Sequence, residues 1–236
     1  MNMAQEDSDG LSVKDKVAFF ERALGFEGLA ASAIQELAHL AAVKSYAKGD
    51  IIFLPNEPCR HFQIVVRGLV KVSIYAPSGF RLTYLLAGQG EPLNLIGPFT
   101  GAIRPISAKA LKKSLVLCIG RDDFVSVAFN HPIIFSNTIS ILGRAIDSAN
   151  LRILDMVEKR VEQRLARVLY TLHTKFGSTL NFTSSELAEL TGTTTESALR
   201  ALGRFRKIGA IRSGRATIQI LDAGLLTSDE QEKLWL

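Results

Sequence analysis

A segment of about forty residues with helical periodicity limits what this chain can fold into more than any other feature. It covers residues 130–172, NHPIIFSNTISILGRAIDSANLRILDMVEKRVEQRLARVLYTL, and only Pro132, near its start, interrupts it. Helices of globular proteins are shorter, roughly 8 to 20 residues. Apolar residues recur in it at alternating steps of three and four, as at the a and d positions of a coiled coil: Ile139, Leu142, Ile146, Ala149, Ile153 and Met156.

This apolar seam predicts a homodimer, because an exposed apolar stripe of such length is a liability on a monomer. The alternative is one amphipathic helix that lies on the chain's own sheet and buries the seam there. Six seam positions do not decide between the two.

The segment before the long helix has a different pattern. After a helical start over residues 15–43, the residues from Lys48 to about Ile119 alternate between β-branched runs, such as IVVRGLVKVSIYA and RLTYLLA, and turn signals such as PSGF. This pattern predicts an antiparallel sheet or roll. The 236 residues suit two modest domains of the α+β class. Hydrophobic residues make up 47% of the chain, which is enough to form a sizeable core.

The segment after the long helix reads FTSSELAELTGTTTESALRALGRFRKIGAIRSGRATIQIL, over residues 182–221. Thr183 and Glu186 form a capping box that opens a first helix, which ends near Gly192 and leads through a short turn to a second helix. This is the spacing of a helix-turn-helix. After Gly209, the pattern alternates around a Ser-Gly-Arg turn and predicts a small β-hairpin, or wing.

Basic charge is concentrated in the second of these helices and in the wing. Residues 1–158 carry 16 Lys or Arg against 15 Asp or Glu, whereas residues 194–215 carry six against one. A basic face is usually only a solvated surface, but here it follows a turn and precedes a wing. We therefore predict a DNA-reading module whose basic face meets phosphates and base edges in a major groove. One helical sector holds Glu196, Arg200, Arg204 and Lys207, and another holds Ala198, Leu202, Phe205 and Ile208.

Two stretches carry a family resemblance. KGDIIFLPNEPCRHFQIVVRGLVKV and SSELAELTGTTTESALRALGRFRKIGAI resemble the opening strands and the helix-turn-helix of the CRP/FNR family of bacterial transcription regulators, the second being similar to the FNR-like branch. The resemblance implies three parts. These are a cyclic-nucleotide-binding-type β-roll with N-terminal helices over residues 1–132, a dimerisation helix over residues 133–160, and a winged helix-turn-helix over residues 161–236.

The resemblance also implies a function. The chain is expected to be a cytoplasmic transcription regulator that binds a near-palindromic site on double-stranded DNA as a homodimer and has RNA polymerase as a partner. An effector in the β-roll is expected to control DNA binding.

The family's base-reading Glu and Arg fall on Glu196 and Arg200, and Thr195 stands where some members carry another base-reading side chain. Leu199 departs from members with a small or hydroxylic residue at its position. Glu196 has an alternative role, because Thr193 lies three residues before it and could form a second capping box with it. Phosphate contacts need charge but little geometry, so we expect them from Arg204, Lys207, Arg212 and Arg215.

The sensor half departs from the cyclic-AMP-binding members of the family. A Gly-Glu pair that holds the ribose in those members falls on Asn94 and Leu95, and an Arg-Ser pair that holds the cyclic phosphate falls on Ile106 and Ser107. Three of four polar anchors are lost, so we expect weak or absent binding of cyclic AMP. Arg104 is an alternative anchor, because on a strand it would share a face with Ile106.

The effector itself is left open by the sequence. Two cysteines are too few for the iron–sulfur cluster of the FNR branch, but a haem needs only one or two axial ligands. Cys59 and His61 are the candidate haem ligands, with a surface loop without metal as the alternative. A small organic ligand between the roll and the long helix is equally compatible, near Leu93, Leu95, Ile96, Arg104, Ser107 and Asn150.

Other functional classes find little support. The chain has no P-loop, G-x-G-x-x-G, G-x-S-x-G or H-E-x-x-H motif, so we do not expect an enzyme. The acidic start MNMAQEDSDG and the lack of an apolar run of about 18 residues argue against secretion and a membrane span. The alternative to a regulator is a ligand-binding or scaffolding protein whose winged helix contacts another protein.

Overall fold

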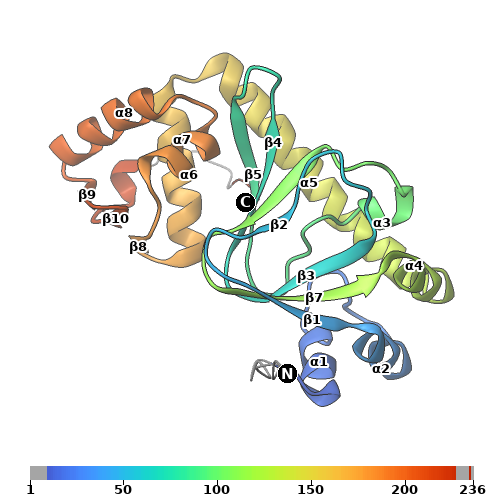
Figure 1. Cartoon of the computed structure of the whole chain (residues 1–236). Coiled ribbons are helices and arrows are strands. Elements are labelled where there is room, and N and C mark those ends of the chain that lie inside the picture. Colours follow the sequence, from blue (N-terminus) through green and yellow to red (C-terminus); the bar gives the residue numbers. More distant parts are fainter. Residues whose placement is uncertain (1–9, 227–233, 235–236) are drawn as a thin grey trace, which may run out of the picture. The chain divides into compact units, whose positions relative to one another are not determined.

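A computed structural model of the chain describes residues 10–226 and Leu234 (Figure 1). It divides into two compact units, one made of Met1–Val72 and Leu86–Ile141, the other of Ser73–Leu85 and Leu142–Leu236. The outer ends of the domains expected from the sequence, residues 1–9, 227–233 and 235–236, lie outside the described residues.

The first unit opens with two helices, α1 (Val13–Phe20) and α2 (Ala31–Leu40). Ser12 caps α1 through a capping box with Asp15. The helical start extends less far than the sequence pattern suggested, because Ala41 leaves the helical conformation and the next residues form strand β1 (Ala42–Tyr46). Strand β1 pairs with strand β7 (Ser114–Gly120), so backbone pairing in the sheet replaces the last helical turn.

The strands form two sheets, which confirms the expected antiparallel roll. The first sheet has the order β1-β7-β3, with β3 spanning His61–Arg67. The second sheet has the order β2-β6-β4-β5. Its strands are β2 (Ile51–Phe53), β4 (Val70–Tyr75), β5 (Arg81–Ala87) and β6 (Ile106–Ala110). The chain turns from β3 to β4 at Gly68, where φ is 106° and a β-carbon would lie 2.6 Å from the Ser114 Cα, so this position requires glycine.

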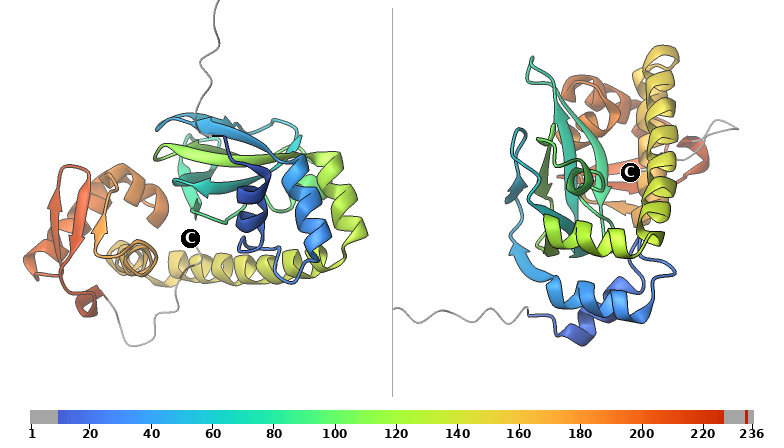
Figure 2. Two further views of the ribbon diagram at one scale, coloured as in Figure 1. Left: turned by 90° about the horizontal axis from the view of Figure 1, so that it is seen from below. Right: turned by 90° about the vertical axis from the view of Figure 1, so that its right-hand side faces the viewer.

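An aromatic cluster fills the core of the first unit. The rings of Phe62 in β3 and Phe124 in helix α4 (Arg121–Asn130) are stacked with their centroids 4.0 Å apart. Phe26 packs edge-on against both rings. A short helix, α3 (Gly97–Thr100), contributes Phe99 to the same cluster. These contacts fix α4 against the sheet. Figure 2 shows the ribbon of these helices and strands in two further views.

The long helical segment is divided into α5 (Ile133–Glu158) and α6 (Val161–Phe176), whereas the sequence pattern suggested one continuous helix. The break falls at Arg160, whose backbone is extended and whose N–H donates to the Gln163 side chain 3.0 Å away, as at a helix start. Within the described residues no single helix is long and apolar enough to cross a membrane, and α4 with α5 meets that criterion only as a pair bent by 106°.

The seam of α5 is largely exposed. Ile139, Ile146 and Ile153 are 67%, 59% and 59% exposed, and Met156 is 44% exposed. Ala149 is also exposed, and Leu142 is half-buried. The chain therefore does not bury this seam on its own sheet, which disfavours the alternative of a helix that packs only within the monomer.

The second unit contains α6, α7 (Ser184–Thr191), α8 (Thr195–Lys207) and a sheet of order β8-β10-β9. The strands are β8 (Thr179–Leu180), β9 (Ile211–Gly214) and β10 (Thr217–Ile220), followed by a 3-10 turn over Gly224–Leu226. The expected helix-turn-helix and wing are therefore present. Ala198, Leu202 and Phe205 are buried as expected, but Ile208 caps the end of α8 and is 55% exposed.

Candidate DNA-binding interface and sensor residues

The turn between α7 and α8 is fixed by a cap and a glycine. The Thr183 hydroxyl accepts from the Glu186 N–H at 3.2 Å, and the Thr183 N–H donates to the Glu186 carboxylate at 2.7 Å, so the predicted capping box is confirmed. Gly192 ends α7 with φ at 68°, and a β-carbon there would lie 2.7 Å from the Met156 Cε. Any residue larger than glycine would be strained at position 192. The left-handed conformation of Gly192 ends α7 and directs the chain into the turn before α8.

The cap of α8 is Thr194, since its hydroxyl accepts from the Ser197 N–H at 3.2 Å. Thr193 instead donates its backbone N–H to Ala188 at the end of α7. The alternative of a capping box between Thr193 and Glu196 is therefore wrong, because the helix begins one residue later. This frees the carboxylate of Glu196 for another role.

Glu196 and Arg200 form an ion pair one helical turn apart on α8. Arg200 also donates from Nη2 to the Ser197 hydroxyl at 2.9 Å. The side chains of Glu196 and Arg200 are 80% and 62% exposed, so both can reach a partner outside the chain. A guanidinium and a carboxylate near the start of such a helix are the groups that read guanine and cytosine in a major groove.

The other predicted DNA-contacting side chains lie around this pair. Thr195 is the exposed first residue of α8, and Arg204, four residues after Arg200, forms an ion pair with Glu162 of α6. Leu199, where the sequence departs from the family, is 49% exposed. Arg206 is also exposed, but the sequence analysis missed it because it falls outside the basic sector of the helix. Exposed cations on α8 and the wing are Lys207, Arg212 and Arg215.

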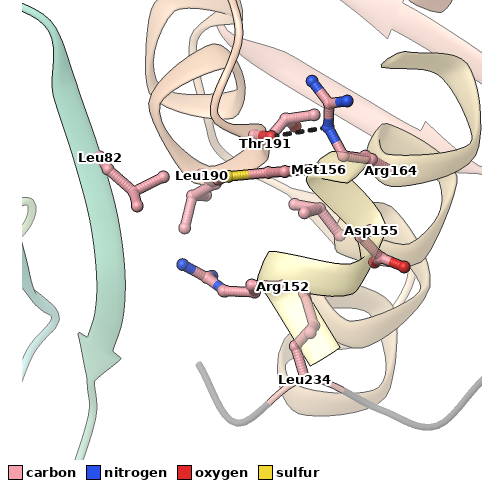
Figure 3. Close-up of a pocket in the computed structure, with 9 residues that line it drawn as sticks. Leu82, Arg152, Asp155, Met156, Arg164, Leu190, Thr191 and Leu234 are labelled. Carbon is pink, nitrogen blue, oxygen red and sulfur yellow. Dashed lines mark hydrogen bonds between the residues drawn. The ribbon is translucent and has the colours of Figure 1, made fainter. Parts of the chain in front are cut away.

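Arg164, which the sequence pattern did not indicate, lies beside Thr191 at the end of α7 (Figure 3). Its guanidinium donates to the carbonyl oxygens of Thr191 and Gly192, each at 3.4 Å, and to that of Lys159 at 3.0 Å. The last carbonyl groups of a helix have no partner inside the helix, so a cation there satisfies them. Arg164 thereby ties the break between α5 and α6 to the helix-turn-helix.

Arg164 and a second cation, Arg152, both line a small cavity of about 20 Å³. The cavity has room for about one water molecule. The Arg152 Nη1 donates to the Thr83 carbonyl oxygen at 3.0 Å. Burial lowers the pKa of Arg152 to about 10, and the nearby Asp155 partly opposes this shift. Asp155 is itself buried and contacts Arg167 at 3.2 Å and Lys159 at 3.3 Å.

The predicted sensor residues belong to both units. Leu93 is fully buried and Leu95 packs against the apolar core, so both have structural roles. Ile96 is half-buried and Ser107 is buried in β6. Asn150 is exposed on α5 and belongs to the second unit.

Arg104 is the unusual residue of the sensor set. It precedes β6 rather than lying on it, so the expectation that it shares a strand face with Ile106 is wrong. Its backbone pairs instead with the neighbouring loop, through Glu57 and Asn56. Its side chain is buried, with the guanidinium 4.2 Å from the centre of the Phe53 ring.

Of the candidate haem ligands, His61 is the first residue of β3 and Cys59 lies two residues before that strand. Cys59 is buried, rather than part of an exposed loop, and its thiol donates to the His61 carbonyl oxygen 3.6 Å away. The His61 ring is half-buried. Its pKa is lowered by burial and by the charges of Lys44, Arg104 and Arg60, which favours the neutral imidazole that binds metals. The described residues contain no cluster of three or more His, Cys, Asp or Glu side chains that could hold a metal ion.

Comparison with known proteins agrees with this architecture. The sequence model of the cyclic nucleotide-binding domain matches residues 43–131, and that of the Crp-like helix-turn-helix domain matches residues 163–228. The chain belongs to the CRP/FNR family of transcription regulators. Its helix-turn-helix is accordingly a DNA-binding module.

Individual family members are similar over most of their length. The CRP-like cAMP-activated global transcriptional regulator of Mycobacterium tuberculosis is 26% identical over 206 residues, covering 84% of this chain and 92% of its own. The anaerobic regulatory protein of Haemophilus influenzae is 28% identical over 210 residues, covering 79% and 82%. The structure of a CRP/FNR family regulator of Thermus thermophilus, TTHA1359, superposes with a TM-score of 0.66 at 26% identity, covering 78% of this chain and 96% of the other.

Proposed function

We propose that this CRP/FNR member acts as a homodimer that reads a near-palindromic DNA site and contacts RNA polymerase, under control of an effector that is not cyclic AMP. The exposed Glu196–Arg200 pair carries the DNA-reading part of this proposal. In the free protein each group neutralises the other. On DNA, Arg200 can bind a guanine through two hydrogen bonds while Glu196 accepts from a cytosine.

The exposed seam of α5 supports the homodimer. Its isoleucines at positions 139, 146 and 153 are each more than half exposed, which is costly for a stable monomer. A twofold axis along such a seam presents two copies of α8, so the half-site centres should lie about 34 Å apart, one turn of DNA.

Selection of binding sites from randomised double-stranded DNA tests this function. A regulator enriches an inverted repeat, and its affinity falls steeply as salt rises because counterions are released from the DNA. A scaffolding protein whose winged helix contacts another protein would enrich no sequence. That outcome would favour the alternative function.

The effector part of the proposal depends on the β-roll. Two relatives are named for cyclic AMP, one from M. tuberculosis and one from T. thermophilus. By the family resemblance, the ribose position falls on Leu95, which packs against the core, and the phosphate position falls on Ile106, which is buried. A haem with a diatomic gas, or a small organic ligand, is the proposed effector. An absorption spectrum of the protein purified from its native cell distinguishes them, since only haem gives a Soret band.

A further inference from the structure

Leu199 is an apolar side chain on the exposed side of α8. It is 49% exposed, whereas the other apolar side chains of this helix are buried: Ala198, Ala201, Leu202 and Phe205. A single exposed leucine on a protein surface needs no explanation by itself. What distinguishes Leu199 is its place among the residues proposed to read DNA.

Leu199 flanks the Glu196–Arg200 ion pair on α8. It follows Glu196 by three residues and Thr195 by four, and residues at these spacings are neighbours on a helix surface. The side chains of a helix lean toward its N-terminus, and the N-terminal residues of a recognition helix contact the base edges in a major groove. Leu199 is therefore placed beside the groups proposed to read bases.

Gly203 lies one helical turn after Leu199 and leaves the backbone bare there. Glycine inside a helix is less favourable than alanine, so its presence calls for a reason. Packing of the described residues does not supply one. Apart from the helix's own backbone, a β-carbon at position 203 would have only the Arg206 Nη2 within 4 Å, at 3.7 Å, which is an ordinary contact. A bare backbone lets another molecule approach closely, so this side of α8 is suited to close contact with DNA.

The base edges in a major groove offer one apolar group, the C5 methyl of thymine. The other groups that distinguish the bases there are hydrogen-bond donors and acceptors. A leucine pressed against a donor or acceptor would remove its water without replacing the hydrogen bond, which costs free energy. A leucine against the methyl group instead buries two apolar surfaces. The side chain of Leu199 therefore matches thymine better than any other base.

We infer that Leu199 contacts the C5 methyl of a thymine in each half-site, close to the base pair that Arg200 and Glu196 read. The inference rests on the proposed function, because it requires α8 in a major groove, and it adds one base to the target. A hydroxyl at this position could donate or accept a hydrogen bond, whereas leucine offers only apolar contact. The departure of this chain from family members with a small or hydroxylic residue at position 199 thereby acquires a consequence for sequence preference.

Replacement of thymine by deoxyuridine tests the inference, because the two bases differ only by the C5 methyl. The probe is a synthetic DNA duplex with the inverted repeat that the full-length protein enriches, and the thymines are replaced one position at a time in both half-sites. Binding is measured by fluorescence anisotropy. At one position, affinity should fall about fourfold for each half-site, as expected for the loss of one buried methyl group.

Three variants show whether this loss depends on Leu199. Leu199→Ala lacks the branched end of the side chain and should reduce the difference between the two duplexes to less than about twofold. The position is exposed and alanine favours a helix, so the fold should be retained. Leu199→Met keeps an apolar side chain of similar volume and should keep the dependence on the methyl group. The matched control is Leu225→Ala, at a leucine of the same unit that is 48% exposed, and it should behave as the wild type.

Failure of this contact is distinguishable from failure of the proposed function. If the enriched repeat contains no thymine, or if every thymine can be replaced without loss, Leu199 contacts no methyl group and the inference is wrong. An equal loss in the wild type and in Leu199→Ala would mean that another side chain contacts the methyl group, which also overturns the inference. If the protein enriches no DNA sequence at all, the proposed function fails and this contact fails with it.

Discussion

The carboxylate of Glu196 and the guanidinium of Arg200 are partners on the exposed face of α8. An exposed pair at this spacing contributes only about 0.3 to 0.5 kcal/mol to a helix, so it is easily exchanged for contacts with DNA. Its main effect is to hold both side chains side by side before DNA is bound. This arrangement underlies the predictions for Arg200 and Glu196.

Arg200→Ala should remove preference at one base pair of each half-site. A contact of this type supplies about 1 to 3 kcal/mol of discrimination between bases, and its loss should leave the other positions unaffected. Binding-site selection with the variant checks this. Loss of affinity without any change in preference would mean that Arg200 contacts only phosphate.

Lys207→Ala is the matched control, because Lys207 lies at the end of the same helix and is expected to bind phosphate. It should weaken binding to all sequences alike and lower the slope of log K against log salt by about one unit. Titrations at several salt concentrations measure this slope. A change of sequence preference in Lys207→Ala would mean that Lys207 contacts a base and not only phosphate.

Glu196→Gln should also change sequence preference. The amide keeps the length of the side chain but offers an NH2 donor group and one acceptor oxygen where the carboxylate offers two acceptor oxygens, so preference for cytosine on the paired strand should fall. Since Thr194 rather than Thr193 caps α8, helix stability should not change appreciably. Wild-type preference in a selection experiment would show that Glu196 does not read a base.

The helix-turn-helix could be predicted from sequence because its signals are local. The capping box at Thr183, the glycine at 192 and the apolar sector of α8 each involve residues within a few positions of one another. The expectation was wrong at Ile208, which is exposed at the end of α8, and at the cap of α8. The second error arose because Thr193, Thr194 and Thr195 are identical side chains in a row. Only the position of the backbone turn distinguishes them.

Contacts between distant residues could not be predicted in this way. The donation from Arg164 to the end of α7 joins residues 27 and 28 positions apart, and Arg104 meets Cys59 across 45 positions. The break at Arg160 does not show in the helical period, since the apolar period continues through it; the boundary at residue 160 came only from the family resemblance. Burial of Arg104 and Leu95 depends on how the strands and helices pack, which periodicity does not specify.

Cyclic AMP should not bind in the micromolar range. The cyclic phosphate would need a cation and the ribose a carboxylate, but Ile106 and Leu95 occupy the expected positions. Isothermal titration calorimetry of the purified protein should show no saturable heat. Tight binding that is lost in Arg104→Gln would contradict this prediction and would show that Arg104 holds the phosphate from its shifted position.

Arg164→Met should destabilise the second unit by about 1 to 2 kcal/mol, since three carbonyl oxygens lose a charged donor. Urea unfolding followed by circular dichroism measures this difference in the free energy of unfolding. Arg206→Met, at an exposed position of α8, is the control and should change it by less than about 0.5 kcal/mol. Equal effects of the two variants would mean that the Arg164 contacts contribute nothing to stability.

The double variant Ile146→Asp with Ile153→Asp should dissociate the proposed dimer. Both side chains are 59% exposed in the single chain and lie two helical turns apart on the seam. Four carboxylates brought together across a twofold axis would be desolvated and would repel one another.

Sedimentation velocity of that variant should give a monomer, and affinity for the full inverted repeat should fall by about 10²-fold or more, because the two half-sites are then bound independently. The control places the same substitution at Ile51 and Ile103, which are 55% and 63% exposed apolar residues of the first unit. That protein should remain dimeric and bind the repeat normally. If the seam variant also remains dimeric, α5 does not hold the dimer and the spacing of the half-sites must be derived from another surface.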